Sequence, residues 1–393
     1  MSAEEWLDYL GEIALIPVII ASLTVFVLYY MFYVAKKPSI ITKRDGKIWE
    51  IINDGCPILR ERFWPLIWCF GSRGQTIIRS LAQSQPKMPY KREVKKMCDG
   101  GQIFLDWIQN DNNQIFPDAE TRPTILLLPG ITGCSAQNYM VHLVRMALEH
   151  GYRCVVFNNR GRGGADLLTP RLYCAIDTDD IGSVVKHIKA KYPQSRLLCT
   201  GVSLGGIILM HYLSEVGKDC PVEAAMAISA CFDPVKNMVN IEEPINRFIY
   251  NSHLTKSLVD TIHRNLDLFA KKLTNNEMKR VLQSSTLREF DEYFTSKMNG
   301  FPSCNEYYKE AILNDKIDLI KIPLLCLNAA DDPFALVSTI NVEAVQASEY
   351  VAVAATTRGG HIGFVDGYGG IVPREEFYFI RVFSQFIDAV LKH

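Results

Sequence analysis

The chain has 393 residues, and its 42 Lys and Arg residues almost balance its 43 Asp and Glu residues, giving a formal net charge of -1 at pH 7. This balance argues against a nucleic-acid partner and excludes a long acidic tail. The eleven cysteines are odd in number and scattered, with no CxxC pair, so they indicate buried structural thiols rather than a zinc or redox site. The length predicts one large domain with smaller attachments.

The first feature along the chain is an uncharged apolar stretch from Ile13 to Ala35. At about 1.5 Å per residue, a helix of this length crosses the roughly 30 Å hydrocarbon core of a bilayer. Residues 1–12 carry acidic side chains where a cleaved signal peptide would be basic. We therefore predict a transmembrane anchor over residues 13–35 behind an N-terminal flank of residues 1–12. A buried core helix is the alternative.

The charges around the anchor are one-sided. Five basic residues follow it (Lys36, Lys37, Lys43, Arg44, Lys47), and only acidic ones precede it. The positive-inside rule then predicts that the rest of the chain faces the cytosol. No Asn-x-Ser/Thr glycosylation site is present, which agrees with that orientation.

Residues 36–90 show no clear period, and we expect an irregular or helical extension without an assigned function. From residue 91 to 393, short apolar runs alternate with amphipathic stretches, which predicts a mostly parallel α/β sheet flanked by helices. The expected strands are Gln102–Trp107, Thr124–Leu128, Arg153–Phe157, Arg196–Thr200, Ala224–Ser229, Pro323–Asn328 and Tyr350–Ala354. The expected crossover helices are Asn138–His150, Asp179–Lys191 and Leu204–Glu215.

Residues 237–321 interrupt this alternation with partly amphipathic, helical sequence. An insertion of this size between strands predicts a helical cap or lid. A second helical layer that only buries sheet surface is the alternative.

The sequence Gly201-Val202-Ser203-Leu204-Gly205 follows an expected strand and begins an expected helix. This is the pattern of a nucleophile elbow, in which a tight turn lifts the serine hydroxyl clear of the sheet. The flanking glycines let the strand and the helix approach each other closely. We therefore expect Ser203 to be a nucleophile. A serine that merely caps a helix is the alternative.

A serine nucleophile needs backbone donors for the oxyanion that develops on its substrate. We expect one to be the N–H of Leu204, directly after the nucleophile. The second should come from the loop Leu128–Gly133, where we choose the N–H of Ile131 and keep Thr132 as the alternative.

The order of catalytic residues in this fold class is serine, acid, histidine. His361 fits the base, because it lies in Gly359-Gly360-His361-Ile362-Gly363 after the last expected strand. We expect structural or solvated roles for the other histidines: His142, His150, His187, His211 and His393. For His253 and His263 in the cap, we keep a smaller expectation that they act as lid contacts. For the acid we choose Asp332, which precedes proline after the strand Pro323–Asn328. Asp331 and Asp233 are the alternatives.

Five sequence runs in this order resemble the membrane-anchored abhydrolase-domain family, from about residue 36 to the C-terminus: Thr121–Gly133, Gly151–Gly161, Gly201–Gly206, Leu327–Phe334 and Gly359–Phe364. Within that family the chain is most similar to the branch that contains a phospholipase of medium-chain phosphatidylcholines. The resemblance implies an α/β-hydrolase fold, the triad Ser203, Asp332 and His361, and esterase activity on phospholipids or acylglycerols. It also implies a lumenal catalytic domain, in conflict with the charge pattern.

The resulting hypothesis is a single-pass serine esterase of the endoplasmic reticulum or another endomembrane, with a lipid ester as substrate and no cofactor, metal or nucleic acid. An ester synthase that transfers the same acyl group to an alcohol is one alternative, as in related yeast enzymes. A non-catalytic lipid-binding or scaffold protein is another. His361 and Asp366 also have the HxxxxD spacing of glycerolipid acyltransferases, which we interpret as coincidence.

Overall fold

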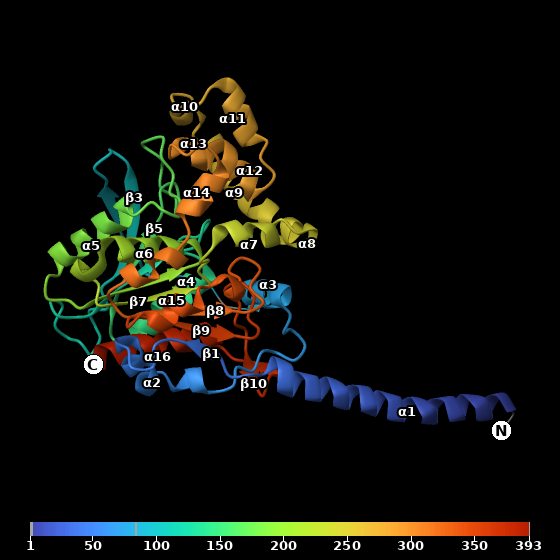
Figure 1. Ribbon diagram of the computed structural model, residues 1–393. Coiled ribbons are helices and arrows are strands. Elements are labelled where there is room, and N and C mark those ends of the chain that lie inside the picture. Colours follow the sequence, from blue (N-terminus) through green and yellow to red (C-terminus); the bar gives the residue numbers. More distant parts are fainter. Residues whose placement is uncertain (1–2, 83–84, 393) are drawn as a thin grey trace.

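A nine-stranded sheet forms the centre of the protein in the part of the chain that the structure describes (Figure 1). The computed structural model describes residues 3–82 and 85–392, and the side chains of residues 15–81 and 85–392. Residues 1 and 2 of the expected N-terminal flank, and His393, lie outside the described residues. The strand order is β1-β9-β8-β7-β6-β4-β5-β3-β2.

The expected strands coincide with seven observed strands to within two residues at each end. The observed strands of the sheet are β1 (Ser39–Ile41), β2 (Lys91–Lys96), β3 (Gln102–Ile108), β4 (Thr124–Leu128), β5 (Arg153–Asn158), β6 (Leu197–Val202), β7 (Ala224–Ile228), β8 (Leu324–Ala329) and β9 (Val351–Thr356). The pairs β4–β5, β4–β6, β6–β7, β7–β8 and β8–β9 are parallel. The prediction of a mostly parallel α/β sheet is therefore confirmed.

The sequence pattern predicts neither of the two edge strands. β1 contains three residues and pairs with β9, whereas β2 reads Lys-Arg-Glu-Val-Lys-Lys and pairs with β3. Both pairings are antiparallel. An edge strand has one unpaired side, and charged side chains there prevent further pairing, so β2 has no apolar run to reveal it.

Helices cover both faces of the sheet and bury a separate apolar cluster on each. One cluster includes α5 (Asp179–Lys191), α6 (Leu204–Val216) and α15 (Val342–Ala347). The other includes α2 (Lys47–Gly55), α4 (Asn138–Glu149) and α16 (Tyr378–Lys392). The sheet side chains are buried on both faces, which is why the central strands have near-continuous apolar sequences.

The chain forms a helical segment between β7 and β8, which appears as the yellow and orange top of Figure 1. Its members are α7 (Pro234–Ile241), α8 (Pro244–Asn246), η4 (Arg247–Asn251), α9 (Ser252–His263), α10 (Leu266–Phe269), α11 (Asn275–Leu282), α12 (Leu287–Phe290), η5 (Asp291–Thr295), α13 (Ser296–Met298), α14 (Cys304–Glu310) and η6 (Asn314–Leu319). We refer to residues 234–319 as the cap. Opening of the cap as a lid stays a prediction.

The N-terminal helix α1 (Ala3–Tyr29) continues into η1 (Tyr30–Val34) and extends away from the rest of the protein (Figure 1). Its segment Leu15–Val34 is long and apolar enough to cross a membrane. The extension that follows contains β1, α2, η2 (Pro57–Arg60) and α3 (Ser72–Ala82). The remaining short elements are η3 (Gly217–Asp219), η7 (Val337–Thr339), β10 (Gly367–Tyr368) and β11 (Val372–Pro373).

Candidate active site

Ser203 lies in the turn between β6 and α6 and has φ 54° and ψ −121°. A positive φ is strained for a residue with a side chain, and such strain concentrates at functional sites. A Cβ on Gly205 would lie 2.3 Å from the carbonyl oxygen of Leu128, and one on Gly201 would lie 2.3 Å from that of Gly205. These glycines therefore let strand, helix and the neighbouring loop meet around the serine.

His361 lies between Ser203 and a buried carboxylate. Its Nε2 is 2.9 Å from Ser203 Oγ, and its Nδ1 is 3.0 Å and 3.1 Å from the two carboxylate oxygens of Asp332. An ionised carboxylate only accepts hydrogen bonds, so Nδ1–H donates to Asp332 and Nε2 accepts from the serine hydroxyl. This tautomer leaves His361 able to take the serine proton.

Asp332 is fully buried, and its Oδ1 also accepts hydrogen bonds from the backbone N–H groups of Phe334 and Ala335. The ring of Phe334 lies 4.5 Å from the imidazole of His361, centroid to centroid. The carboxylate is thus held by its own loop, and the imidazole is covered on one side.

The two alternative acids lie elsewhere. Oδ1 of Asp331 accepts a hydrogen bond from the N–H of Gly360, one residue before the histidine, and burial raises the pKa of this carboxyl to about 6. Asp233 caps α7 by accepting from the N–H of Lys236 and pairs with the ammonium group of the same lysine. The structure therefore brings Asp332, and neither alternative, to the imidazole.

Three of the other described histidines have partners away from Ser203. His150 contacts Ser384 and Asp388, and His187 contacts Glu93. His211 lies 3.3 Å from the carbonyl oxygen of Ala311, and burial lowers its pKa to about 4.

Two residues of α3 hold the loop that carries His361, and the sequence patterns singled out neither of them. The N–H of His361 donates to Thr76 Oγ1 at 2.9 Å, and the N–H of Val365 donates to Gln75 Oε1. Gln75 is fully buried and also donates to the carbonyl oxygens of Cys69 and Val365. In the sequence, the only hint of this support was that polar residues lie in the segment of α3, to which no function was assigned.

The loop after β4 lies against the serine, since a Cβ on Gly130 would be 3.3 Å from Ser203 Cβ. The N–H of Gly130 donates to the hydroxyl of Tyr139, and its carbonyl accepts from the N–H of Gly133. Ile131 and Thr132 both line the adjacent cavity. Leu204 is the first residue of α6, where backbone N–H groups have no acceptor within the helix.

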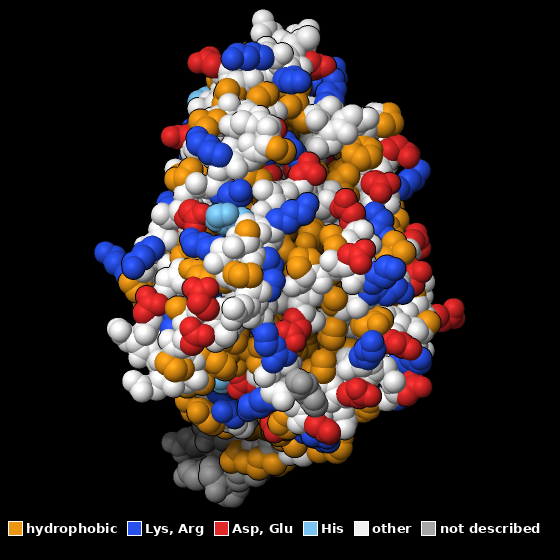
Figure 2. Space-filling model, turned by 90° about the vertical axis from the view of Figure 1, so that its left-hand side faces the viewer, with side chains coloured by type: hydrophobic (Ala, Val, Ile, Leu, Met, Phe, Trp, Pro, Cys, Tyr) orange, Lys and Arg blue, Asp and Glu red, His pale blue; other side chains and the backbone are white. Residues whose placement is uncertain are grey.

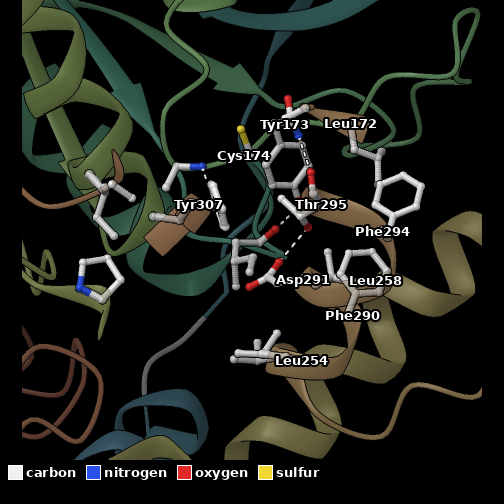
Figure 3. A pocket seen from close by; sticks show the side chains of 18 of the residues that line it. Leu172, Tyr173, Cys174, Leu254, Leu258, Phe290, Asp291, Phe294, Thr295 and Tyr307 are labelled. Carbon is white, nitrogen blue, oxygen red and sulfur yellow. Dashed lines mark hydrogen bonds between the residues drawn. The ribbon is translucent and has the colours of Figure 1, made fainter. Parts of the chain in front are cut away.

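A cavity of about 1280 Å³ adjoins Ser203 and His361 and extends beneath the cap. Figure 3 shows Leu258, Phe290 and Phe294 of the cap grouped on one side of it. Asp291 also lines the cavity and accepts hydrogen bonds from Thr295 and Tyr308. Burial raises the pKa of this carboxyl to about 6.

Asp366 of the HxxxxD spacing and the eleven cysteines are further features that the sequence singled out. The carboxylate of Asp366 pairs with Arg374 and Arg381. All eleven cysteines have free thiols. Among the described residues, no group of His, Cys, Asp and Glu side chains could hold a metal ion.

Comparison with known proteins adds family information to this geometry. Residues 123–368 match the sequence pattern of the α/β-hydrolase fold. The chain is 40% identical to human phospholipase ABHD3 over 365 residues, which covers 93% of this chain and 88% of that protein. It is 28% identical to mouse monoacylglycerol lipase ABHD2 over 344 residues, covering 82% and 79% of the two chains.

Among solved structures, a Pyrococcus furiosus esterase matches with a TM-score of 0.45 at 18% identity, covering 71% of this chain and 87% of the esterase. A bacterial membrane phospholipase A matches with a TM-score of 0.47 at 16% identity and covers 98% and 100%.

Proposed function

Because the chain belongs to the α/β-hydrolase family, with phospholipase and lipase relatives, we propose that it is a membrane-anchored serine esterase that hydrolyses acyl esters of phospholipids or acylglycerols. The observation that carries this proposal is the chain of contacts from Ser203 Oγ through the imidazole of His361 to the buried carboxylate of Asp332.

In the proposed reaction, Ser203 Oγ attacks the ester carbonyl while Nε2 of His361 takes the hydroxyl proton. Asp332 stabilises the imidazolium that forms. We assign the oxyanion to the backbone N–H groups of Leu204 and Ile131. The N–H of Gly130 is already donated to Tyr139, and Thr132 stays the alternative to Ile131. His361 then protonates the departing alcohol, and a water molecule activated by the same imidazole releases the fatty acid.

The size and lining of the cavity support a lipid substrate. At about 1280 Å³, it exceeds the usual range of small-molecule sites, about 300–1,000 Å³. Its cap side carries large apolar side chains, which suit an acyl chain. The relatives named phospholipase and monoacylglycerol lipase point to the same substrate class.

The decisive test is labelling of the full-length protein with a fluorophosphonate probe, which reacts with activated serines. We expect labelling of the wild type and none of Ser203→Ala. No labelling of the wild type, or equal labelling of the variant, would refute the proposed chemistry.

Product analysis separates the proposed hydrolase from an ester synthase. The protein is incubated with a phospholipid and a short alcohol, and we expect free fatty acid. A new ester as the main product would instead assign acyl transfer to the alcohol.

The side of the membrane on which the catalytic domain lies is a separate question, which protease protection in sealed microsomes answers. The basic residues after α1 predict a cytosolic domain that added protease digests, whereas the family resemblance predicts a lumenal domain that is protected.

A further inference from the structure

The end of the apolar helix packs against the rest of the protein. Tyr30, Val34 and Ala35 are buried, together with partly buried side chains that include Trp64 and Phe70. The hydroxyl of Tyr30 donates to the carbonyl oxygen of Pro65, at 2.5 Å. These contacts set the direction in which α1 leaves the protein, and a bilayer crossed by α1 would meet the side from which it leaves.

That side carries exposed apolar side chains. α3, α8 and the β10–β11 hairpin lie on the side from which α1 leaves (Figure 1). On these elements and their neighbours, Phe248 is 84% exposed and Leu81 is 76% exposed. We define the interfacial face by six exposed apolar residues: Trp68, Leu81, Val239, Phe248, Ile371 and Val372.

Hydrogen bonds and ring contacts join the segments of this face to one another and to α1. The indole N–H of Trp68 donates to the carbonyl of Ile371, which joins the loop before α3 to the hairpin. Arg73 Nε donates to the side chain of Asn246, which joins α3 to α8. The ring of Phe70, two residues after Trp68, lies 6.3 Å from that of Phe26 within the apolar helix. The face is thus continuous with the surface of α1.

The side away from α1 carries a mixed surface. Figure 2 views this side, where Lys, Arg, Asp and Glu side chains are scattered among apolar ones. Exposed apolar side chains gathered on one side of a protein mark an interaction site. Beside an apolar helix that leaves the protein at that side, the matching partner is a lipid surface.

We propose that the interfacial face lies in the headgroup and upper acyl region of the same bilayer that α1 crosses. Phenylalanine and leucine side chains bury apolar area there, and tryptophan prefers this depth. Lys36 and Lys37, both exposed at the end of the helix, lie where they can meet lipid phosphates. The proposal rests on the proposed function only in taking α1 as a membrane anchor.

Contact with lipid at this face would bring the cavity to the substrate. Arg79 of α3 and Met238 and Ile241 of α7 line the cavity, and Thr76 of α3 holds His361. The same helices thus carry the interfacial face and border the route to Ser203. An acyl chain could then pass from the bilayer to the serine with little exposure to water.

Photocrosslinking tests the placement without using activity. The full-length Ser203→Ala protein is reconstituted into phosphatidylcholine vesicles that contain a phospholipid with a photoreactive acyl chain, and crosslinked peptides are located by mass spectrometry. We expect crosslinks in residues 68–81, 239–250 and 368–372 in addition to α1. Crosslinks confined to α1, or equally frequent around Val94 on β2, would overturn the proposal. Crosslinks at the face together with a wild type that fluorophosphonate does not label would refute only the proposed function.

Paired variants test the consequence for catalysis. In Leu81→Ser/Phe248→Ser, we expect hydrolysis of vesicle phospholipid to fall at least about fivefold, with turnover of a soluble short-chain ester unchanged. The matched control Val94→Ser/Leu319→Ser removes exposed apolar side chains from other elements and should change neither rate. Absence of a selective fall in vesicle hydrolysis would contradict the proposal.

Discussion

Replacement of Asp332 by asparagine tests the assignment of the acid most directly. The carboxylate is fully buried and lies 3.0 Å from Nδ1 of His361. Two unit charges at that distance interact by about 5.5 kcal/mol at an effective dielectric constant of about 20. Since about 1.36 kcal/mol corresponds to a tenfold change in rate, loss of this interaction with the imidazolium predicts a fall in kcat of about 10⁴. The amide of Asp332→Asn would also favour the wrong imidazole tautomer.

Asp331→Asn is the matched control, because it makes the same chemical change one residue earlier. The amide oxygen can still accept the hydrogen bond from the N–H of Gly360. Burial raises the pKa of Asp331 to about 6, so burial opposes its ionisation and an uncharged amide can take its place. We expect kcat of this variant within about threefold of the wild type, because nothing that touches the imidazole changes.

The assay is hydrolysis of a soluble nitrophenyl ester by the full-length protein in detergent, at saturating substrate, with thermal melting to compare folding of both variants. Equal losses of kcat in the two variants would refute the assignment. So would an Asp332→Asn protein that folds normally and keeps more than about a tenth of its kcat.

The remaining predictions concern packing, ionisation and positioning. Gly205→Ala should lower the free energy of unfolding by about 1–3 kcal/mol, because the added Cβ meets backbone oxygens. In the control Gly182→Ala the added Cβ makes ordinary contacts only, so the free energy of unfolding should stay unchanged or rise by up to about 1 kcal/mol. Denaturant melts compare the two variants. Burial raises the pKa of Asp291 to about 6, so its ionisation costs stability increasingly as the pH rises from about 4 to about 6. Asp291→Asn should therefore gain about 2–3 kcal/mol at pH 7.5 and almost nothing at pH 4, and an equal gain at both would contradict this reasoning. Thr76→Val should lower kcat about tenfold through misplacement of His361, with KM unchanged, and Thr76→Ser should restore kcat; a loss that serine does not restore would indicate a packing role.

Local sequence predicted the parts of the site that depend on local geometry. Ser203 lies in a turn that only small neighbours permit, and the two glycines that permit it are visible in the sequence. The loop of His361 is similar, since Gly360 has φ 56° and a Cβ there would lie 2.2 Å from the carbonyl oxygen of Ser72. The choice of Asp332 over Asp331 rested on the following proline, and the structure places that carboxylate beside the imidazole.

Contacts between distant parts of the chain were not predictable in the same way. Thr76 and His361 are separated by 285 positions, and no pattern in either segment refers to the other. Strand β1 also depends on a distant partner, because its three residues form a strand only through pairing with β9. The extension of residues 36–90 therefore had no assigned function at the sequence level.

In the structure, this extension joins the end of the apolar helix to the loop that carries His361. Pro65 of the extension accepts the hydrogen bond of Tyr30 and forms a β-bridge with Asp366, five residues after His361. From the other side, Thr357 donates to the carbonyl oxygen of Val34 at the end of the helix. The segments on either side of the expected boundary between residues 35 and 36 thus pack against each other. The last turn of the apolar helix is therefore buried against the segment that supports the loop of His361, and we expect movement of α1 relative to the sheet to shift the imidazole.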